Sequence, residues 1–257
     1  MNQSTGVRLE RDGPVLVVTL CRPEELNSQT PELWCRLREI GRELPGDVRI
    51  VVVRSEGQSF SVGRSTAAPN PDAPTTDAVV PQTPRLSGAE VETLISAYQD
   101  GFRWLRRPDL VSVAAVQGHA AGAGFQLALA CDLRVLADDA QLSMTEINFG
   151  LVPDLGGTKR LVELVGYARA LEICLTGRRI RAEEAFQTGL ASLVVPREQL
   201  PGAVRDLVAV LVASPRRAVS EVKALIAMAA GNSYPEQEAA ERAAQARRIQ
   251  ERADLGE

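Results

Sequence analysis

Four short runs of β-branched residues constrain the fold of this 257-residue chain more than any other feature. They cover residues 15–20 (VLVVTL), 50–54 (IVVVR), 111–116 (VSVAAV) and 132–136 (DLRVL). Runs of this length and composition are typical of buried strands. Segments with helical patterns lie between them, and this alternation predicts an α/β fold with mainly parallel strands.

The first predicted helix carries several start signals. Thr30 is placed to cap it and Pro31 suits its first position, while Leu33, Leu37 and Ile40 recur at helical spacing. The same reasoning predicts further helices over residues 89–105, 124–131, 158–164 and 168–176.

The chain becomes helical throughout after residue 196. Three helices are predicted there, over residues 200–213, 215–230 and 235–253. We therefore predict a core domain over residues 1–195 and a helical region over residues 196–257. The last helix has a thin apolar side, so it either packs on another surface, such as another subunit, or stands solvated.

Composition excludes several classes of function. A formal net charge of −4 and an isoelectric point near 5.3 argue against a nucleic-acid partner. The four cysteines are scattered and His119 is the single histidine, so we expect no metal site. Neither a signal peptide nor a membrane span is predicted, so we expect a cytoplasmic protein without a membrane partner. The proline-rich residues 67–88 predict a surface loop, which is either a plain linker or a lid over a ligand.

A glycine-rich stretch, GHAAGAG at residues 118–124, stands at the head of an apolar helix. Its glycines either make tight turns or expose backbone N–H groups to a ligand. The residues alone favour the tight turns.

Four motifs in the order found here resemble the enoyl-CoA hydratase/isomerase (crotonase) superfamily along nearly the whole chain. They are FSVGRS at residues 60–65, VQGHAAGAGFQLALACDLRV at 116–135, TEINFGLVPDLGGTKRL at 145–161 and AEEAFQTGLASLVVP at 182–196. The resemblance implies a spiral of ββα units followed by a helical trimerisation region. It implies an acyl-CoA thioester as substrate, no separate cofactor, and a homotrimer or a dimer of trimers.

The resemblance also implies an oxyanion hole, in which two backbone N–H groups hold the thioester oxygen. The donors would be Arg64, which follows the turn at Gly63, and Ala123, at the N-terminus of a helix between Gly122 and Gly124. Fixed N–H donors stabilise the enolate that forms when a proton leaves the substrate.

Proton transfer would fall to residues at three positions. Hydratases of the family carry two glutamates, and here Gln126 replaces the first while Glu146 retains the second. An amide can hold a water molecule but cannot exchange a proton near neutral pH, so Glu146 is the best candidate for acid and base. Asp154 occupies a position where dienoyl-CoA isomerases of the family carry an aspartate; alternatively, it caps the following helix.

Two further residues have weaker signals. Lys223 lies where family members often place a basic side chain near the CoA phosphates, although a solvated helix lysine looks the same. His119 precedes the glycine run, and a structural role is favoured for it.

These residues together favour double-bond isomerisation of an enoyl-CoA through Glu146. Hydration of a 2-enoyl-CoA despite Gln126 is the alternative, followed by a specialised hydrolase or dehydratase. A non-catalytic acyl-CoA-binding subunit is the competing class.

Overall fold

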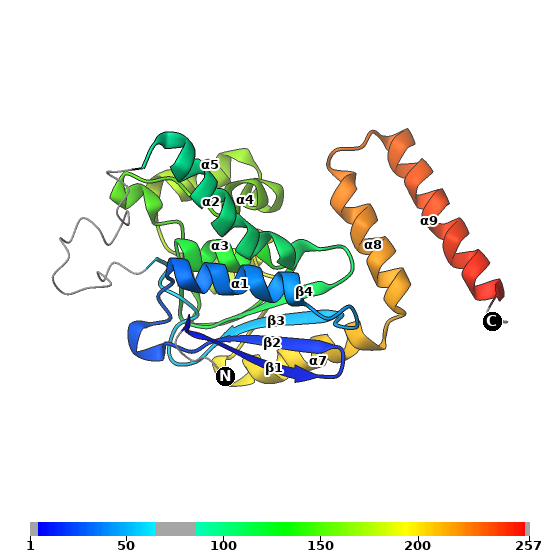
Figure 1. Ribbon diagram of the computed structural model, residues 1–257, viewed down its shortest axis with the longest axis horizontal. Helices are drawn as coiled ribbons and strands as arrows, with labels where there is room; N and C mark the ends of the chain where they lie inside the picture. The colour runs from blue at the N-terminus through cyan, green and yellow to red at the C-terminus, as the bar shows by residue number, and fades with distance from the viewer. Residues whose placement is uncertain (1–4, 65–85, 255–257) are drawn as a thin grey trace.

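A twisted sheet of six strands forms the centre of the molecule in the computed structural model, which describes residues 5–64 and 86–254 (Figure 1). The strand order is β1-β2-β3-β4-β6-β9; the pair β1 and β2 is antiparallel and the other neighbours are parallel. The strands are β1 (Val7–Asp12), β2 (Val15–Leu20), β3 (Ile50–Ser55), β4 (Val111–Val116), β6 (Leu133–Ala137) and β9 (Leu193–Val195). The predicted α/β class with mainly parallel strands is confirmed.

Each face of this sheet is covered by helices, and the alternation along β3 shows how. Val51 and Val53 point into the larger apolar core, beneath α1 (Pro31–Glu43) and α2 (Gly88–Arg103). Ile50 and Val52 point into a second core on the opposite face, where α7 (Leu200–Ala213) packs. Figure 1 shows α1 and α7 on opposite sides of the strands. Burial on both faces explains why these strands lack polar alternation.

A second, three-stranded sheet stands above the first and positions the glycine-rich stretch. Its order is β5-β7-β8, with β5 (His119–Ala121), β7 (Gln141–Ser143) and β8 (Ile180–Arg181). The short helix α3 (Ala123–Ala130) starts directly after β5, and all of its residues are buried.

Three further helices follow α3 along the chain, and the first of them packs on it. They are α4 (Gly157–Val165), α5 (Tyr167–Thr176) and α6 (Ala182–Gln187), with 3-10 turns at Pro23–Glu25, Trp104–Arg106, Glu146–Phe149 and Arg197–Gln199. The strands β1, β5, β7, β8 and β9 were not expected from the sequence. The last four span only two or three residues each, and β1 carries a polar pattern.

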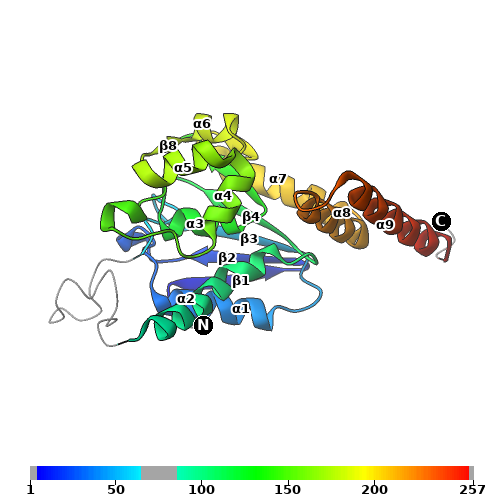
Figure 2. The ribbon, with the colours of Figure 1, turned by 90° about the horizontal axis from the view of Figure 1, so that it is seen from above.

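Two C-terminal helices, α8 (Arg216–Ala229) and α9 (Tyr234–Asp254), form an antiparallel pair that projects from the body (Figures 1 and 2). They pack on each other, and only Ala244 of this pair is buried. The predicted helices of this region are confirmed, but α7 differs from the other two because it packs on the sheet. The domain boundary at residue 195 and the trimer stay predictions.

Candidate active site

Two glycines let the backbone of residues 61–64 lie directly against the start of α3. A Cβ on Gly63, whose φ is +87°, would lie 2.5 Å from the Ala121 carbonyl oxygen and 3.2 Å from the Ala123 nitrogen. A Cβ on Gly124 would lie 2.4 Å from the Ser61 oxygen. No other residue type fits either place without displacing backbone atoms, so the two glycines form an interlock between these segments.

The interlock brings together the two peptide groups that were predicted as oxyanion donors. Ala123 is the first residue of α3, so its N–H has no acceptor within the helix. The helix N-terminus also carries partial positive charge. The Arg64 N–H directly follows Gly63, which lies in close contact with the backbone of residues 121–123.

The Arg64 side chain packs against the buried Trp34 of α1. Its guanidinium lies 5.2 Å from the ring centroid of Trp34, within the range of a cation–π contact. The Trp34 indole in turn donates to Gln29 Oε1 at 2.8 Å, and the Gln29 N–H donates to the Gly63 oxygen at 2.7 Å. The turn at Gly63 is therefore tied to Trp34 of α1 in two ways: through the hydrogen bonds of Gln29 and through the side chain of Arg64.

The Glu146 carboxylate lies beside Gly122, directly before α3. A Cβ on Gly122 would lie 3.3 Å from Glu146 Oε1, and the φ of +50° and ψ of −120° at Gly122 suit glycine. Glu146 Oε1 accepts a hydrogen bond from Gln126 Nε2 at 2.7 Å. Glu146 Oε2 is buried and has no hydrogen-bond partner among the residues that the structure describes. Burial raises the pKa of Glu146 above its ordinary value, and the charge of Asp154 adds to the rise.

Gln126 fixes this carboxylate by using both ends of its amide. Its Oε1 accepts from the N–H groups of Leu155 at 2.9 Å and Gly157 at 3.2 Å, at the start of α4. That acceptance forces Nε2 to face Glu146. The sequence reasoning gave Gln126 the role of holding water and missed this contact, because nothing in the spacing of residues 126 and 146 indicates that they meet.

Asp154 lies close enough to Glu146 for their charges to interact. Burial raises the pKa of Asp154, and the nearby Arg64 guanidinium counteracts the rise. The alternative prediction, that Asp154 caps the next helix, is wrong. Gly156 occupies the cap position of α4 in a left-handed conformation, and the N–H of Gly157 at the start of that helix is bound by Gln126 instead of Asp154.

Comparison with known proteins identifies the family of this chain. The model of the enoyl-CoA hydratase/isomerase family matches residues 10–254. The chain belongs to this family. The motif-based resemblance and the crotonase-like fold are thereby confirmed, and the chain is an enzyme of this acyl-CoA-acting family.

Solved structures and curated relatives give the same result. A Thermobifida fusca YX protein assigned to the enoyl-CoA hydratases, in complex with CoA, is 47% identical, with 98% of this chain and 95% of that chain covered and a TM-score of 0.90. Its complex with acetoacetyl-CoA matches with a TM-score of 0.88 over 96% of each chain. The carnitinyl-CoA dehydratase of Salmonella enteritidis PT4 is 33% identical over 86% of this chain and 79% of its own. The short-chain-enoyl-CoA hydratase of Clostridium acetobutylicum is 28% identical over 79% and 73%.

Lys223 does not join the other predicted site residues of this family member. Its ammonium group donates to the carbonyl oxygens of Arg107 and Leu110 and to Asp132 Oδ2, each at 2.7 Å. These acceptors precede β4 and β6, whereas Gly63 and Gly122 follow β3 and β4, so Lys223 lies at the opposite edge of the parallel sheet. Its three donors are all used within the fold, which leaves none for the CoA phosphates that the sequence reasoning assigned to it.

His119 contributes through its backbone, because its carbonyl oxygen accepts from the Ser61 N–H at 2.9 Å.

Within residues 5–64 and 86–254, no three or more His, Cys, Asp or Glu side chains gather where they could hold a metal ion. Over the same residues, no helix has the length and apolar character needed to cross a membrane. The predicted loop at residues 67–88 lies almost wholly outside the described residues.

Proposed function

We propose that this enzyme moves the double bond of a 3-enoyl-CoA to the 2 position, with Glu146 as the single group that removes and returns the proton. One observation carries the proposal: Glu146 has one oxygen fixed by Gln126 and its other oxygen buried without a partner, beside the N-terminus of α3. A buried carboxylate oxygen without a hydrogen bond is costly to maintain, and it is available to accept a proton.

The reaction needs charge stabilisation and one mobile proton. The thioester oxygen would accept from the N–H groups of Arg64 and Ala123. Glu146 Oε2 takes a proton from C2, the electron pair spreads over the dienolate, and the same oxygen returns the proton to C4. Each fixed N–H donor of such a site contributes about 3 kcal/mol of transition-state stabilisation.

The environment of Glu146 suits both halves of this cycle. Burial disfavours the charged form, so the carboxylate is a stronger base than an exposed glutamate. The protonated side chain then keeps its proton until the proton is transferred to C4 of the dienolate. Gln126 cannot exchange protons, so it orients the carboxylate without competing for the proton. Asp154 supplies a second titratable group for substrates whose proton must travel farther.

Reversible addition of water to a 2-enoyl-CoA is the second candidate. The names of two relatives, a carnitinyl-CoA dehydratase and a short-chain-enoyl-CoA hydratase, favour it. In this reaction Glu146 would act on the water as well as on C2, without the second glutamate.

Ultraviolet absorbance of the conjugated thioester distinguishes these reactions. We expect the absorbance to grow from a 3-enoyl-CoA and to stay nearly constant with the matching 2-enoyl-CoA. A fall with the 2-enoyl compound and no change with the 3-enoyl compound would replace isomerisation by hydration. CoA binding without any turnover of either compound would indicate a non-catalytic acyl-CoA-binding subunit.

A further inference from the structure

A cavity of about 460 Å³ opens at the end of α1 that is remote from the candidate active site. Residues of α1, α2 and the 3-10 turn at Trp104–Arg106 line it. At 1.5 Å per residue, Arg42 in this cavity lies about 16 Å along α1 from Pro31, which stands next to the segment that anchors Gly63. The cavity is therefore separate from the site of the thioester.

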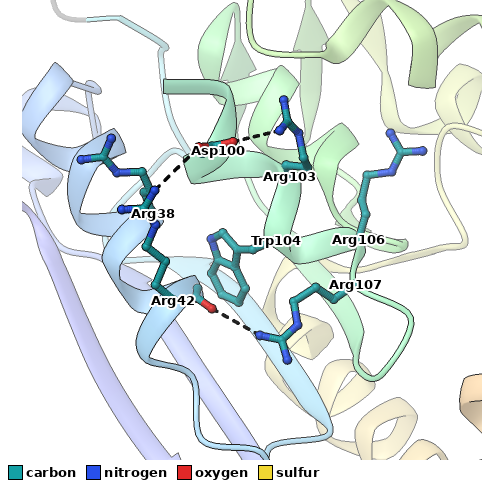
Figure 3. A pocket seen from close by; sticks show the side chains of 8 residues that line it. Arg38, Arg42, Asp100, Arg103, Trp104, Arg106 and Arg107 are labelled. Carbon is teal, nitrogen blue, oxygen red and sulfur yellow. Dashed lines mark hydrogen bonds and ion pairs between the residues drawn. The ribbon is translucent and has the colours of Figure 1, made fainter. Parts of the chain in front are cut away.

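Cationic side chains dominate its wall (Figure 3). Five of the residues that line it with Trp104 are arginines, namely Arg38, Arg42, Arg103, Arg106 and Arg107. In Figure 3 the guanidinium groups of Arg103 and Arg106 point away from the Trp104 indole. Among the described residues that line the cavity, Asp100 is the single carboxylate. This excess of positive charge occurs on a chain whose formal net charge is −4, so it is a local feature.

Arg107 is held by two hydrogen bonds to Asp109, at 2.9 and 2.6 Å, and by one to the Gly41 oxygen. The carboxylates that approach the other four arginines neutralise them incompletely. Asp100 is shared, since it lies 3.0 Å from Arg103 and 4.0 Å from Arg42. Glu163 lies 3.7 Å from Arg106 and also contacts Lys159 and Arg160. Exposed pairs of this kind contribute little to stability, so a multiply charged anion can displace them.

Two N–H donors at this cavity lack an acceptor among the described residues. They are the Trp104 indole Nε1 and Arg38 Nε, and both atoms are buried. Trp104 is itself only 7% exposed and packs so closely that a Cβ on Gly41 would lie 2.2 Å from its ring. A buried donor without an acceptor destabilises the fold, and an entering oxyanion would supply the missing acceptors.

We propose that this cavity binds an anion that carries a diphosphate group. Guanidinium groups pair with phosphate oxygens through two parallel hydrogen bonds, and the four arginines that no carboxylate holds by two hydrogen bonds exceed what a single small anion can engage. The volume of the cavity also exceeds that of one phosphate. Free pyrophosphate and a nucleoside diphosphate share the required chemistry, and the volume admits the former entirely.

Calorimetric titration of the full chain with inorganic pyrophosphate, at fixed ionic strength, tests the proposal. We expect saturable binding that weakens at least tenfold in Arg42→Gln and further in the double variant Arg38→Gln/Arg42→Gln. Arg42 is largely exposed, so the single variant keeps the fold. Arg36→Gln is the matched control, because Arg36 lies on the same helix, pairs with Glu39 and lines no part of the cavity. Equal binding by the parent and Arg42→Gln would overturn the proposal.

Trp104→Phe separates a binding role from a packing role, because it removes the indole N–H and keeps an aromatic ring. We expect weaker pyrophosphate binding at a temperature well below the Tm of the variant, which the smaller ring lowers, with an unchanged far-ultraviolet circular dichroism spectrum. Undiminished binding by Trp104→Phe would show that the unpartnered donors do not serve the anion. A parallel titration with ADP distinguishes the sources: tighter binding of ADP that is lost in Arg42→Gln indicates a nucleoside diphosphate, and weaker binding indicates free pyrophosphate.

Discussion

The charged side chains buried at the two ends of helix α3 differ in how completely they are hydrogen-bonded. At the C-terminal end, the Arg134 side chain is 2% exposed and donates to four carbonyl oxygens, those of Ala128, Cys131, Asp132 and Leu190. At the N-terminal end, Glu146 has one oxygen held by Gln126 and the other without a partner. A charge with every hydrogen bond made stabilises the fold, whereas an incompletely satisfied charge is available for chemistry.

Lys223 extends the first of these arrangements. It binds Asp132, whose Oδ2 also accepts from the backbone and the hydroxyl of Ser112. Burial lowers the pKa of Arg134 to about 10, so this side chain keeps its charge at neutral pH. The C-terminal end of α3 is thus a closed network, and the predictions below test whether the N-terminal end differs as proposed.

The largest effect is expected for Glu146→Gln. Removal of the proton-transfer group should lower kcat about 10³-fold, within the usual range for acid–base catalysis. The Tm should not fall, because the variant replaces a buried carboxylate of raised pKa by a neutral amide. Turnover of a 3-enoyl-CoA and thermal unfolding measure the two quantities, and activity within tenfold of the parent would remove Glu146 from the mechanism.

Lys223→Met should have the opposite profile. It leaves Asp132 partly buried without its cation, and breaking a buried pair typically costs about 3 kcal/mol. Denaturant unfolding should show this loss while the KM for the acyl-CoA stays unchanged. A raised KM with unchanged stability would restore the role in CoA phosphate binding that the structure does not support.

Gln126→Leu should give an intermediate result. The variant removes the hydrogen bond that orients Glu146 and leaves the N–H groups of Leu155 and Gly157 without their acceptor. We expect kcat to fall about tenfold and the free energy of unfolding to fall by about 1–3 kcal/mol. Gln126→Glu is the informative companion, because its carboxylate would meet Glu146 at hydrogen-bond distance and the two would share a proton. Hydratase activity in that variant would show that only the second carboxylate was missing.

The smallest effect is expected for Asp154→Asn and concerns pH. Glu146 must be ionised to act as base, so activity should rise with pH through an apparent pKa above the ordinary glutamate value. The charge of Asp154 contributes to this rise, so the variant should shift the acidic limb of the kcat/KM profile to lower pH. An unshifted limb would mean that Asp154 is uncharged in the working enzyme.

The same raised pKa has a consequence for stability. The folded protein binds the Glu146 proton more tightly than the unfolded chain does, so the free energy of unfolding falls as pH rises from the ordinary glutamate pKa to the raised one. Glu146→Gln should abolish this part of the pH dependence.

The sequence predicted the fold wherever local pattern decided it. The strands β2, β3, β4 and β6 and the capped helix α1 follow from β-branched runs and helical spacing. The two- and three-residue strands of the second sheet have no such pattern, because pairing with distant segments defines them.

The candidate site was less accessible from sequence. Motif resemblance pointed to Gly63, Ala123 and Glu146, and the structure brings these together. It could not reveal the bond from Gln126 to Glu146, which depends on the packing of α4, or the partners of Lys223, which lie more than ninety residues away in the chain. Hydrogen bonds between distant segments are set by the assembled fold.

The glycine interlock at Gly63 and Gly124 has a consequence for how such a chain can evolve. The proposed peptide donors do not depend on the side chains of Arg64 and Ala123, whereas the proposed proton chemistry depends on positions 126, 146 and 154, which lie outside the interlock. Substitutions at those three positions leave the interlock unchanged. A lineage can therefore exchange one thioester reaction for another in single mutational steps, each of which keeps the stabilised oxyanion.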